Sequence, residues 1–349
     1  YLSDMTKIDP CTIPTHDDKV ISLFNGTKAL NIPANLAKDY NEANGAIGLP
    51  EFGTRFVRGM LEESLPNSFS DLVRISGLSH GTNVWANNQQ LLIKQGKHLN
   101  ELVTCRDDIM LYLASKGIEP LTAFKIMEDI RKGRGIKSEY GQIMKEHVPS
   151  WYIDACKKIV YLFPKAHAAA YVLSAWRIAW FKVYYPLAYY ATYFSVRCEV
   201  FDLVSMMQGI NGIKTRMQEI KKSTKDKASL SKRDQDLYDM LEVALEMCYR
   251  GYKFSNIDLQ KSDATLFVVD EENKAIIPPF TVLDGLGKSV ADSIVQARKV
   301  HPFDSLDDFK KRTSVNKNLI VALEHLGVFK GLSQSNQLCF DFDNLNSNN

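Results

Sequence analysis

The sequence lacks the cysteine spacings that would indicate a metal site or a disulfide framework. Six cysteines are scattered over 349 residues, and none of them forms a CxxC pair or a Cys/His ligand spacing. We therefore expect reduced thiols, the state in which cytoplasmic proteins keep their cysteines, and predict a cytoplasmic location.

A long uninterrupted apolar run is also missing. The most apolar stretch, 168–194, is broken by Arg177, Lys182 and Pro186, which argues against a membrane span. No secretory signal is recognisable. Because the first residue is Tyr1 rather than Met, we expect the chain to be a piece of a longer protein.

The chain has little net charge, a formal +2, but its cations are unevenly distributed. Residues 131–137, RKGRGIK, hold four cations and no acid. The stretch 214–233 holds eight cations against only Glu219 and Asp226. Local basic clusters of this kind favour a polyanionic partner more than the total charge suggests.

Length and periodicity predict two or three domains and a mostly helical fold. Apolar residues recur at helical spacing from residue 51 to about 200, and Gly117 and Gly133 stand where glycines end helices. A second helical stretch, 201–251, contains a basic loop. Residues 252–280 alternate as in two or three short strands with a turn at 270–273, and short helices return over 284–330. The last stretch, 333–349, is predicted to be a flexible tail.

The most informative segment is 160–194, an aromatic and apolar run that we expect to be helical. It contains Lys165 and His167 just after Pro164, close to three alanines and Tyr171. A buried cation needs an anionic partner or access to solvent. A flat ligand carrying phosphates would provide the anion for Lys165 and His167 and a ring for Tyr171. The alternative is an ordinary core helix whose polar side chains extend to the surface.

The segment 283–294, LDGLGKSVADSI, has the pattern of a helix-hairpin-helix. Gly285 and Gly287 permit a tight turn, Leu286 packs into the core, and Lys288 and Ser289 open a helix whose free N–H groups suit a DNA phosphate. Residues 314–329 resemble a second, degenerate hairpin in which Lys317 is the candidate phosphate contact. The alternative for each is a helical turn that only packs.

Three further segments offer polar groups. The loop RKGRG (131–135) could bring cations to phosphates, and GLSHGTNVW (77–85) is predicted to be a polar loop at a ligand site or a capping loop. Asp107 and Asp108 open a helix, where they favour its dipole, so we predict no metal site there. The tail segment QLCFDF (337–342) has anchors that favour a groove on a partner.

Together these strings resemble the PolC-type C-family replicative DNA polymerases of low-GC Gram-positive bacteria. They include GLPEFGTRFVRGML (48–61), CRDDIMLYL (105–113), FKIMEDIRKGRG (124–135), VPSWYIDACKKIVYLFPKAHAAAYV (148–172), IPPFTVLDGLGKSVADSIVQAR (277–298) and QLCFDF (337–342). They cover nearly the whole chain in the expected order.

The resemblance implies a fold and a role for each domain. Residues 1–200 would be the helical fingers domain, which binds the incoming dNTP, and 201–251 a helical connection. Residues 252–332 would be a small α+β duplex-binding domain with tandem helix-hairpin-helix motifs, and 333–349 a tail. The candidate nucleotide-binding residues are Lys165, His167, Tyr171, Arg106, Arg131, Arg134, Ser79, His80, Arg55 and Arg58. The candidate DNA-binding residues are Gly285, Gly287, Lys288, Ser289 and Lys317, and the sliding-clamp anchors are Gln337, Leu338, Phe340 and Phe342.

The resemblance also implies what this chain does not contain. In the family, the palm carboxylates that hold Mg²⁺ lie upstream of the segment matched here, as do the exonuclease and a zinc site. We therefore expect no metal bound by this chain and no DNA synthesis by the chain alone. Its expected partners are primer-template DNA, dNTP, the sliding clamp and the rest of the polymerase (palm, thumb and exonuclease).

A second hypothesis does not involve a nucleotide. The chain would be a non-catalytic helix-hairpin-helix module that binds DNA and is tethered to the sliding clamp, and a repair nuclease subunit is a weaker version of it. The segment 160–194 separates the two hypotheses, because only the polymerase needs a nucleotide surface there.

Overall fold

The computed structural model describes residues 1–223 and 230–335. Two compact units divide the chain, the first over 1–186 and the second from 187 onward. The division falls before residue 200, where the sequence pattern placed the end of the first domain, and the functional domain boundaries stay predictions. None of the described helices is long and apolar enough to cross a membrane.

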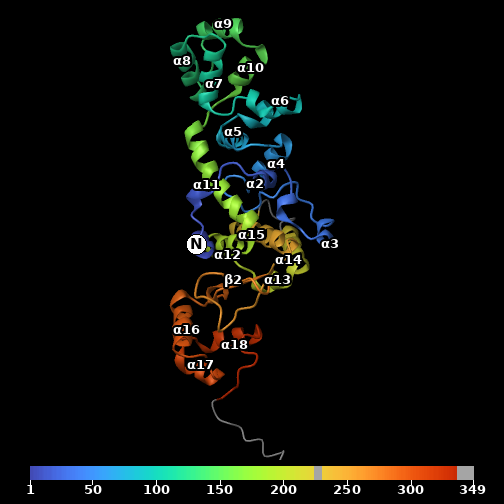
Figure 1. Cartoon of the computed structure of the whole chain (residues 1–349), viewed down its shortest axis with the longest axis vertical. Helices are drawn as coiled ribbons and strands as arrows, with labels where there is room; N and C mark the ends of the chain where they lie inside the picture. The colour runs from blue at the N-terminus through green and yellow to red at the C-terminus, as the bar shows by residue number, and fades with distance from the viewer. Residues whose placement is uncertain (224–229, 336–349) are drawn as a thin grey trace, which may run out of the picture. The chain divides into compact units, whose positions relative to one another are not determined.

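Every regular element of the described first unit is helical, as the periodicity predicts (Figure 1). Its α-helices are α1 (Leu2–Thr6), α2 (Asp18–Asn25), α3 (Ala34–Ala37), α4 (Arg55–Ser64), α5 (Phe69–His80), α6 (Gln90–Lys94), α7 (Arg106–Ser115), α8 (Pro120–Arg131), α9 (Ser138–His147), α10 (Ser150–Lys158) and α11 (Lys165–Tyr184). Short helical turns are η1 (Pro10–Thr12), η2 (Lys28–Leu30), η3 (Trp85–Gln89) and η4 (Leu99–Glu101).

Local sequence signals set the ends of these helices. Ser68 accepts from the Asp71 N–H at 3.1 Å and so caps α5, and Glu119 accepts from the first turn of α8. Gly117 and Gly133 follow α7 and α8 with φ of 91° and 66°, a left-handed conformation that glycine adopts without steric cost. The predicted helix ends at these two glycines are confirmed.

Helix α11 is the spine of the first unit. It packs against α2 and α5, which lie beside it in Figure 1. Trp176 is almost fully buried in this contact, with its indole N–H donating to the Pro14 carbonyl at 2.7 Å. The alanines at 168, 175 and 179 are buried too, so part of the small-residue pattern serves close packing within the chain rather than a ligand.

Two expectations for this unit are wrong in detail. The helix predicted over 160–194 begins only at Lys165, because 160–164 is extended and Pro164 forms the N-cap, and it is interrupted at Tyr185. The polar loop predicted over 77–85 is partly helix, because α5 continues to His80. Gly77 serves close packing within this helix rather than a loop, because an added Cβ there would lie 2.6 Å from the Thr104 carbonyl oxygen.

The second unit combines helices with a small sheet. Its helices are α12 (Pro186–Arg197), α13 (Leu203–Met207), α14 (Gly209–Ser223), α15 (Lys232–Tyr249), η5 (Phe280–Val282), α16 (Lys288–Val300), α17 (Leu306–Arg312) and α18 (Lys317–His325). The strands are β1 (Lys253–Phe254), β2 (Val268–Asp270) and β3 (Ala275–Ile277). These three short strands and the turn between β2 and β3 confirm the strands and the turn predicted within residues 252–280.

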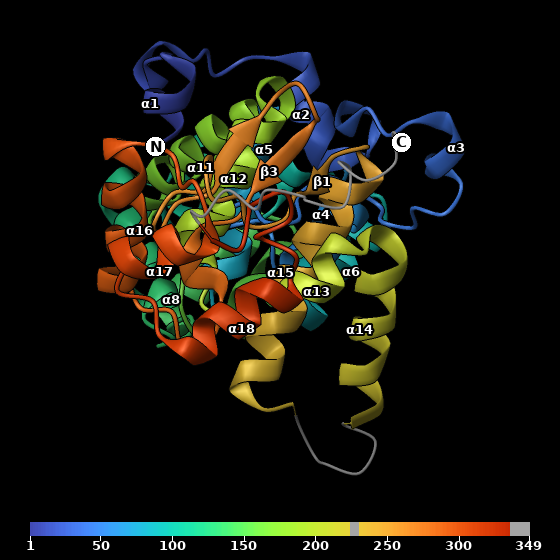
Figure 2. The ribbon, with the colours of Figure 1, turned by 90° about the horizontal axis from the view of Figure 1, so that it is seen from below.

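The sheet has the order β1-β3-β2, with β1 parallel and β2 antiparallel to β3. All three residues of β3 are buried. Figure 2 shows the sheet strands together and α14 and α15 side by side. A separate core holds the C-terminal helices together, with Phe280, Leu286, Phe309 and Leu323 among its buried members. This core positions the predicted hairpins.

Candidate nucleotide and DNA interface

The extended segment 160–164 brings sequence-distant candidates together in the first unit. Its backbone forms hydrogen bonds with Thr82, which follows α5, at 3.0 and 3.1 Å. Phe163 accepts from the Arg106 N–H at the start of α7, at 3.2 Å, and the Leu162 N–H donates to the Arg131 carbonyl at the end of α8. One short segment therefore links three helix ends to the start of α11.

Lys165, the first residue of α11, has an anionic partner in the chain itself. Its Nζ lies 2.9 Å from Oδ1 of Asp108, and its backbone N–H donates to Oδ2 of Asp107 at 2.9 Å. Asp108 also accepts from the Cys105 N–H at 3.0 Å and so caps α7. Because the Lys165 side chain remains 36% exposed, the ion pair leaves the ammonium accessible to a second anion.

Four rings gather beside this ion pair. The His80 and Phe163 rings stack with centroids 4.7 Å apart, and Phe163 also contacts the rings of His167 and Tyr171 at 6.2 and 6.4 Å. Tyr171 is 49% exposed, so this group of rings is partly accessible to solvent. Phe163 was missed by the sequence analysis, although its place directly before Pro164 was a signal that its ring lies at the helix start.

His80 is held by a residue from a different part of the chain. Its Nε2 lies 2.6 Å from Oε2 of Glu51, which has the left-handed φ of 65°. The segment that leads to Glu51 is held by the buried Lys182, whose Nζ donates to the carbonyls of Gly45 and Ile47 at 2.8 and 2.5 Å. This positioning of His80 depends on three segments that sequence spacing does not connect.

The cations of the 131–135 loop are largely compensated by carboxylates of their own helix. Arg131 and Lys132 both pair with Glu128, and the Nη1 of Arg134 lies 3.6 Å from Asp129. Hydrogen bonds from Arg131 and Lys132 lower the pKa of Glu128 to about 2. This loop is therefore a weaker anion site than the sequence suggested, although Arg134 keeps an exposed side chain.

Four other predicted nucleotide ligands have different surroundings. Arg58 is buried and pairs with Glu42 at 3.0 Å, so its environment argues against the predicted contact with a triphosphate. Arg55 is exposed at the start of α4, and Ser79 donates to the Ser76 carbonyl within α5. Arg106 opens α7 with its Nε 3.9 Å from Asp107. Of these four, only Arg106 is tied directly to the segment 160–164.

The first predicted hairpin runs from η5 into α16. Gly285 has φ of 82°, which requires glycine's freedom, and Leu286 is buried in the core as expected. Gly287 caps α16, and an added Cβ there would meet nothing within 4 Å. Gly287, Lys288 and Ser289 are exposed, so the start of α16 is open to a phosphate.

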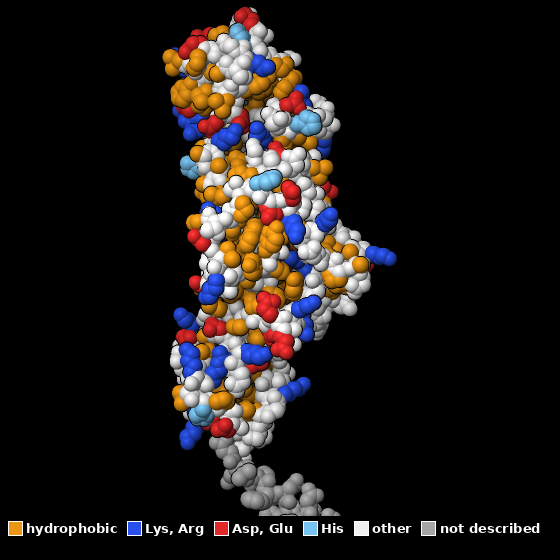
Figure 3. All heavy atoms as spheres, in the orientation of Figure 1, with side chains coloured by type: hydrophobic (Ala, Val, Ile, Leu, Met, Phe, Trp, Pro, Cys, Tyr) orange, Lys and Arg blue, Asp and Glu red, His pale blue; other side chains and the backbone are white. Residues whose placement is uncertain are grey.

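The second hairpin, α17 and α18, repeats this plan. Val315 is buried where Leu286 stands in the first, and the Asn316 side chain caps α18 by accepting from the Leu319 N–H at 3.0 Å. Lys317 is then the first residue of α18, as Lys288 is of α16. Figure 3 shows Lys and Arg side chains gathered over the region of α16.

One group in the described residues has the composition of a metal site: His301, Asp304 and Asp308. The Nη1 of Arg312 donates to Asp308 at 2.6 Å and lies 3.0 Å from Nδ1 of His301. A guanidinium therefore takes the place that a metal cation would need, and the group does not fit a metal.

The predicted clamp anchors lie outside the described residues. They are Gln337, Leu338, Phe340 and Phe342.

Two family models match the chain. The bacterial DNA polymerase III alpha subunit finger domain matches residues 2–148, and a helix-hairpin-helix motif matches 251–338. "DNA polymerase III PolC-type" of Ureaplasma parvum is 49% identical over 342 residues, which is 97% of this chain. The same protein of Bacillus subtilis is 48% identical over 339 residues, also 97% of this chain.

The chain belongs to the PolC-type DNA polymerase III family. It spans 24% of the length of the Ureaplasma relative and 23% of the Bacillus relative. The family assignment and the mostly helical fold with helix-hairpin-helix motifs confirm the resemblance found in the sequence. The individual site residues stay predictions, and the geometry favours the group around Lys165 over Arg58.

Proposed function

We propose that this chain is the nucleotide-contacting and DNA-contacting part of a replicative DNA polymerase. The observation that carries the proposal is the match to PolC-type DNA polymerase III over 97% of the chain. The gathering of Lys165, His167, Tyr171 and His80 at the start of α11 supports it, because this is the only part of the first unit where the sequence led us to expect a phosphate and a ring together.

In this proposal the start of α11 receives the incoming dNTP. Lys165 supplies positive charge to the triphosphate and His167 a ring nitrogen, with Arg106 adjacent, and Tyr171 offers its half-exposed ring to a base. The reaction would be in-line attack of the primer 3′-hydroxyl on the α-phosphate. These residues would contribute charge and positioning, while proton transfer and metal chemistry are left to the rest of the protein.

The Mg²⁺ ions of the reaction would be held by carboxylates in the remainder of the polymerase. We accordingly propose that the chain alone does not synthesise DNA. A primer-extension assay in which the purified chain gave Mg²⁺-dependent synthesis would overturn that.

The two hairpins would hold the primer-template duplex by its backbone, through the exposed starts of α16 and α18. The tail would bind the sliding clamp through Gln337 and its neighbours, and the complete enzyme would act in the cytoplasm. Fluorescence anisotropy on a duplex, comparing the chain with its Lys288→Glu variant at two salt concentrations, tests the hairpin contact. Loss of salt-sensitive binding in the variant is expected.

The nucleotide role is tested in the complete PolC-type polymerase. Lys165→Ala and Tyr171→Ala should each raise the KM for dNTP at least tenfold, while Lys157→Ala on the exposed face of α10 serves as a control. Unchanged dNTP kinetics with intact duplex binding would instead favour the second hypothesis, a DNA-binding module with no nucleotide role.

A further inference from the structure

A basic surface in the second unit has no part in the proposed function so far. We call it the α14–α15 end: the exposed Lys221, Lys222, Lys232 and Arg233, which flank residues 224–229 on the last turn of α14 and the first turn of α15. Figure 2 shows the two helices side by side, with these ends together. Four cations therefore stand at one end of a helix pair.

Two lysines of α14 lie against tyrosine rings of α15. The Nζ of Lys214 lies 5.2 Å from the Tyr249 ring centroid, and that of Lys221 lies 5.3 Å from the Tyr238 ring centroid. A tyrosine ring attracts a lysine without removing its charge. Among the described residues, Lys222, Lys232 and Arg233 form no ion pair within 4.0 Å.

Lys232 and Arg233 also stand where the helix dipole disfavours them. Cations in the first turn of a helix oppose its positive end, at a cost of about 0.3–1 kcal/mol each. The same placement recurs at Lys288 and Lys317, the first residues of the two hairpin helices. Asp234 lies in the same turn, where its carboxylate accepts from the Ser231 hydroxyl at 2.7 Å and offsets part of this cost. An external anion would remove the cost.

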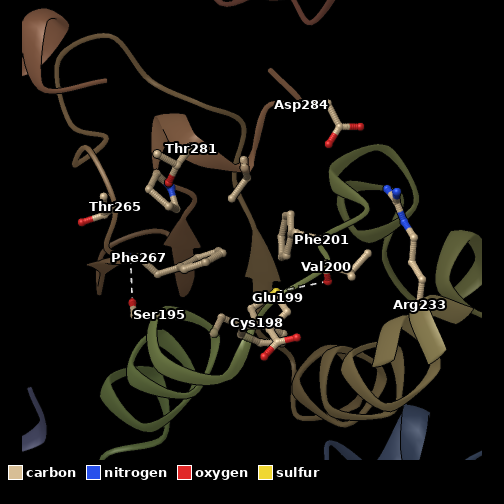
Figure 4. Close-up of a pocket in the computed structure, with 13 residues that line it drawn as sticks. Ser195, Cys198, Glu199, Val200, Phe201, Arg233, Thr265, Phe267, Thr281 and Asp284 are labelled. Carbon is tan, nitrogen blue, oxygen red and sulfur yellow. Dashed lines mark hydrogen bonds between the residues drawn. The ribbon is translucent and has the colours of Figure 1, made fainter. Parts of the chain in front are cut away.

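A cavity connects this surface to the first hairpin. It has a volume of about 410 Å³, and its lining includes Arg233 of α15, Glu199 after α12, and Asp284, which directly precedes Gly285 of the hairpin loop. Figure 4 shows Arg233 and Asp284 on the same side of this cavity. The two carboxylates make the cavity itself unsuitable for a small anion. A long anion lying on the hairpin loop, however, would pass close to Arg233.

We propose that the α14–α15 end is a second phosphate-binding surface, which extends the grip of the first hairpin along the backbone of the same DNA duplex. The proposal rests on the duplex contact proposed above. A duplex is favoured over a small anionic ligand because the cations are spread over two helix ends rather than converging on one point. It is favoured over a compact acidic partner because the hairpin loop at the cavity rim is itself built for a phosphate backbone.

The test is the salt dependence of duplex binding by the whole chain, measured by fluorescence anisotropy between 50 and 200 mM salt. The test variant is Lys222→Gln/Lys232→Gln/Arg233→Gln. The matched control, Lys28→Gln/Lys38→Gln/Lys253→Gln, removes the same charge from exposed lysines elsewhere. A hairpin variant, Lys288→Gln/Lys317→Gln, is measured beside them.

Three phosphate contacts should contribute about 2.7 to the slope of log K against log salt concentration, at about 0.9 each. Over this fourfold change in salt, the unmodified chain should therefore lose about 40-fold more affinity than the test variant. The control should keep the original slope. If the slope of log K decreases as much in the control as in the test variant, the decrease reflects the loss of any three positive charges, and the proposal fails.

The hairpin variant separates this proposal from the one on which it rests. Weakened binding by the hairpin variant, with a test variant that behaves like the control, would overturn the α14–α15 surface and leave the hairpin contact standing. A reduced slope in the test variant with an unaffected hairpin variant would show phosphate binding at the α14–α15 end, but it would refute the hairpin contact and with it the role of this surface as an extension of the hairpin. A chain that binds no duplex at all would refute both.

Discussion

The pair between Lys165 and Asp108 decides whether the leading nucleotide ligand is available to a phosphate. The two side chains are 36% and 16% exposed, so the attraction between them acts through partial solvent screening. Pairs of this kind contribute about 0.5–1 kcal/mol to stability. An ion pair this weak can be exchanged for a triphosphate, whereas a tightly coupled pair would hold Lys165 in a structural role.

A double-mutant cycle with Lys165→Met and Asp108→Asn measures this coupling. Lys165→Met should cost about 0.5–1 kcal/mol. Asp108→Asn should cost about 2–3 kcal/mol, because it also weakens the cap of α7 and removes a negative charge from the positive end of the helix. The double variant should then be less destabilised than the sum of the two, by about 0.5–1 kcal/mol.

Urea unfolding followed by tryptophan fluorescence is the assay. All four tryptophans, at positions 85, 151, 176 and 180, lie in the first unit, so the signal reports the unit that contains the pair. The same cycle on Lys157 and Asp154, whose side chains are 58% and 65% exposed, is the control and should give a smaller coupling. A coupling above about 2 kcal/mol for Lys165 and Asp108 would refute the reasoning, because the lysine would then be committed to its partner.

Three further predictions concern the stability and chemistry of the chain. Lys182→Met should destabilise the first unit by about 2–5 kcal/mol, because the carbonyls of Gly45 and Ile47 lose a charged donor; a calorimetric Tm within 1 °C of the original would contradict this. Burial raises the pKa of Cys105, Cys198 and Cys248 to about 12 and that of Cys156 further. At pH 8, a thiol reagent followed by peptide mass spectrometry should therefore label the exposed Cys11 well before these four. Glu128→Gln should lower stability at pH 7, and the difference should disappear as pH falls from about 4.5 to about 2, because the folded-state pKa of Glu128 is depressed and its contribution is lost on protonation; a difference that persists at pH 2 would show that the lost contribution is not electrostatic.

Much of the candidate site could be anticipated, because its signals are local. Lys165, His167 and Tyr171 lie within two turns of one helix, and the hairpin glycines and lysines follow one another directly. What could not be anticipated was the compensation of charge. Nothing in the spacing shows that Asp108 reaches Lys165 or that Glu42 pairs with Arg58. The i,i+3 and i,i+4 spacing of Glu128 with Arg131 and Lys132 was a signal for those two pairs, which the sequence analysis missed.

The sequence by itself determined the helices, the short strands, the two hairpins and the family, because periodicity, glycine placement and contiguous strings depend on neighbouring residues. Only the tertiary structure decided which cations remain accessible. Accessibility depends on carboxylates and rings brought from distant segments, as when Phe163 and Glu51 meet at His80. It also decided that Arg233 and Asp284 line one cavity, because folding brings together residues that are far apart along the chain.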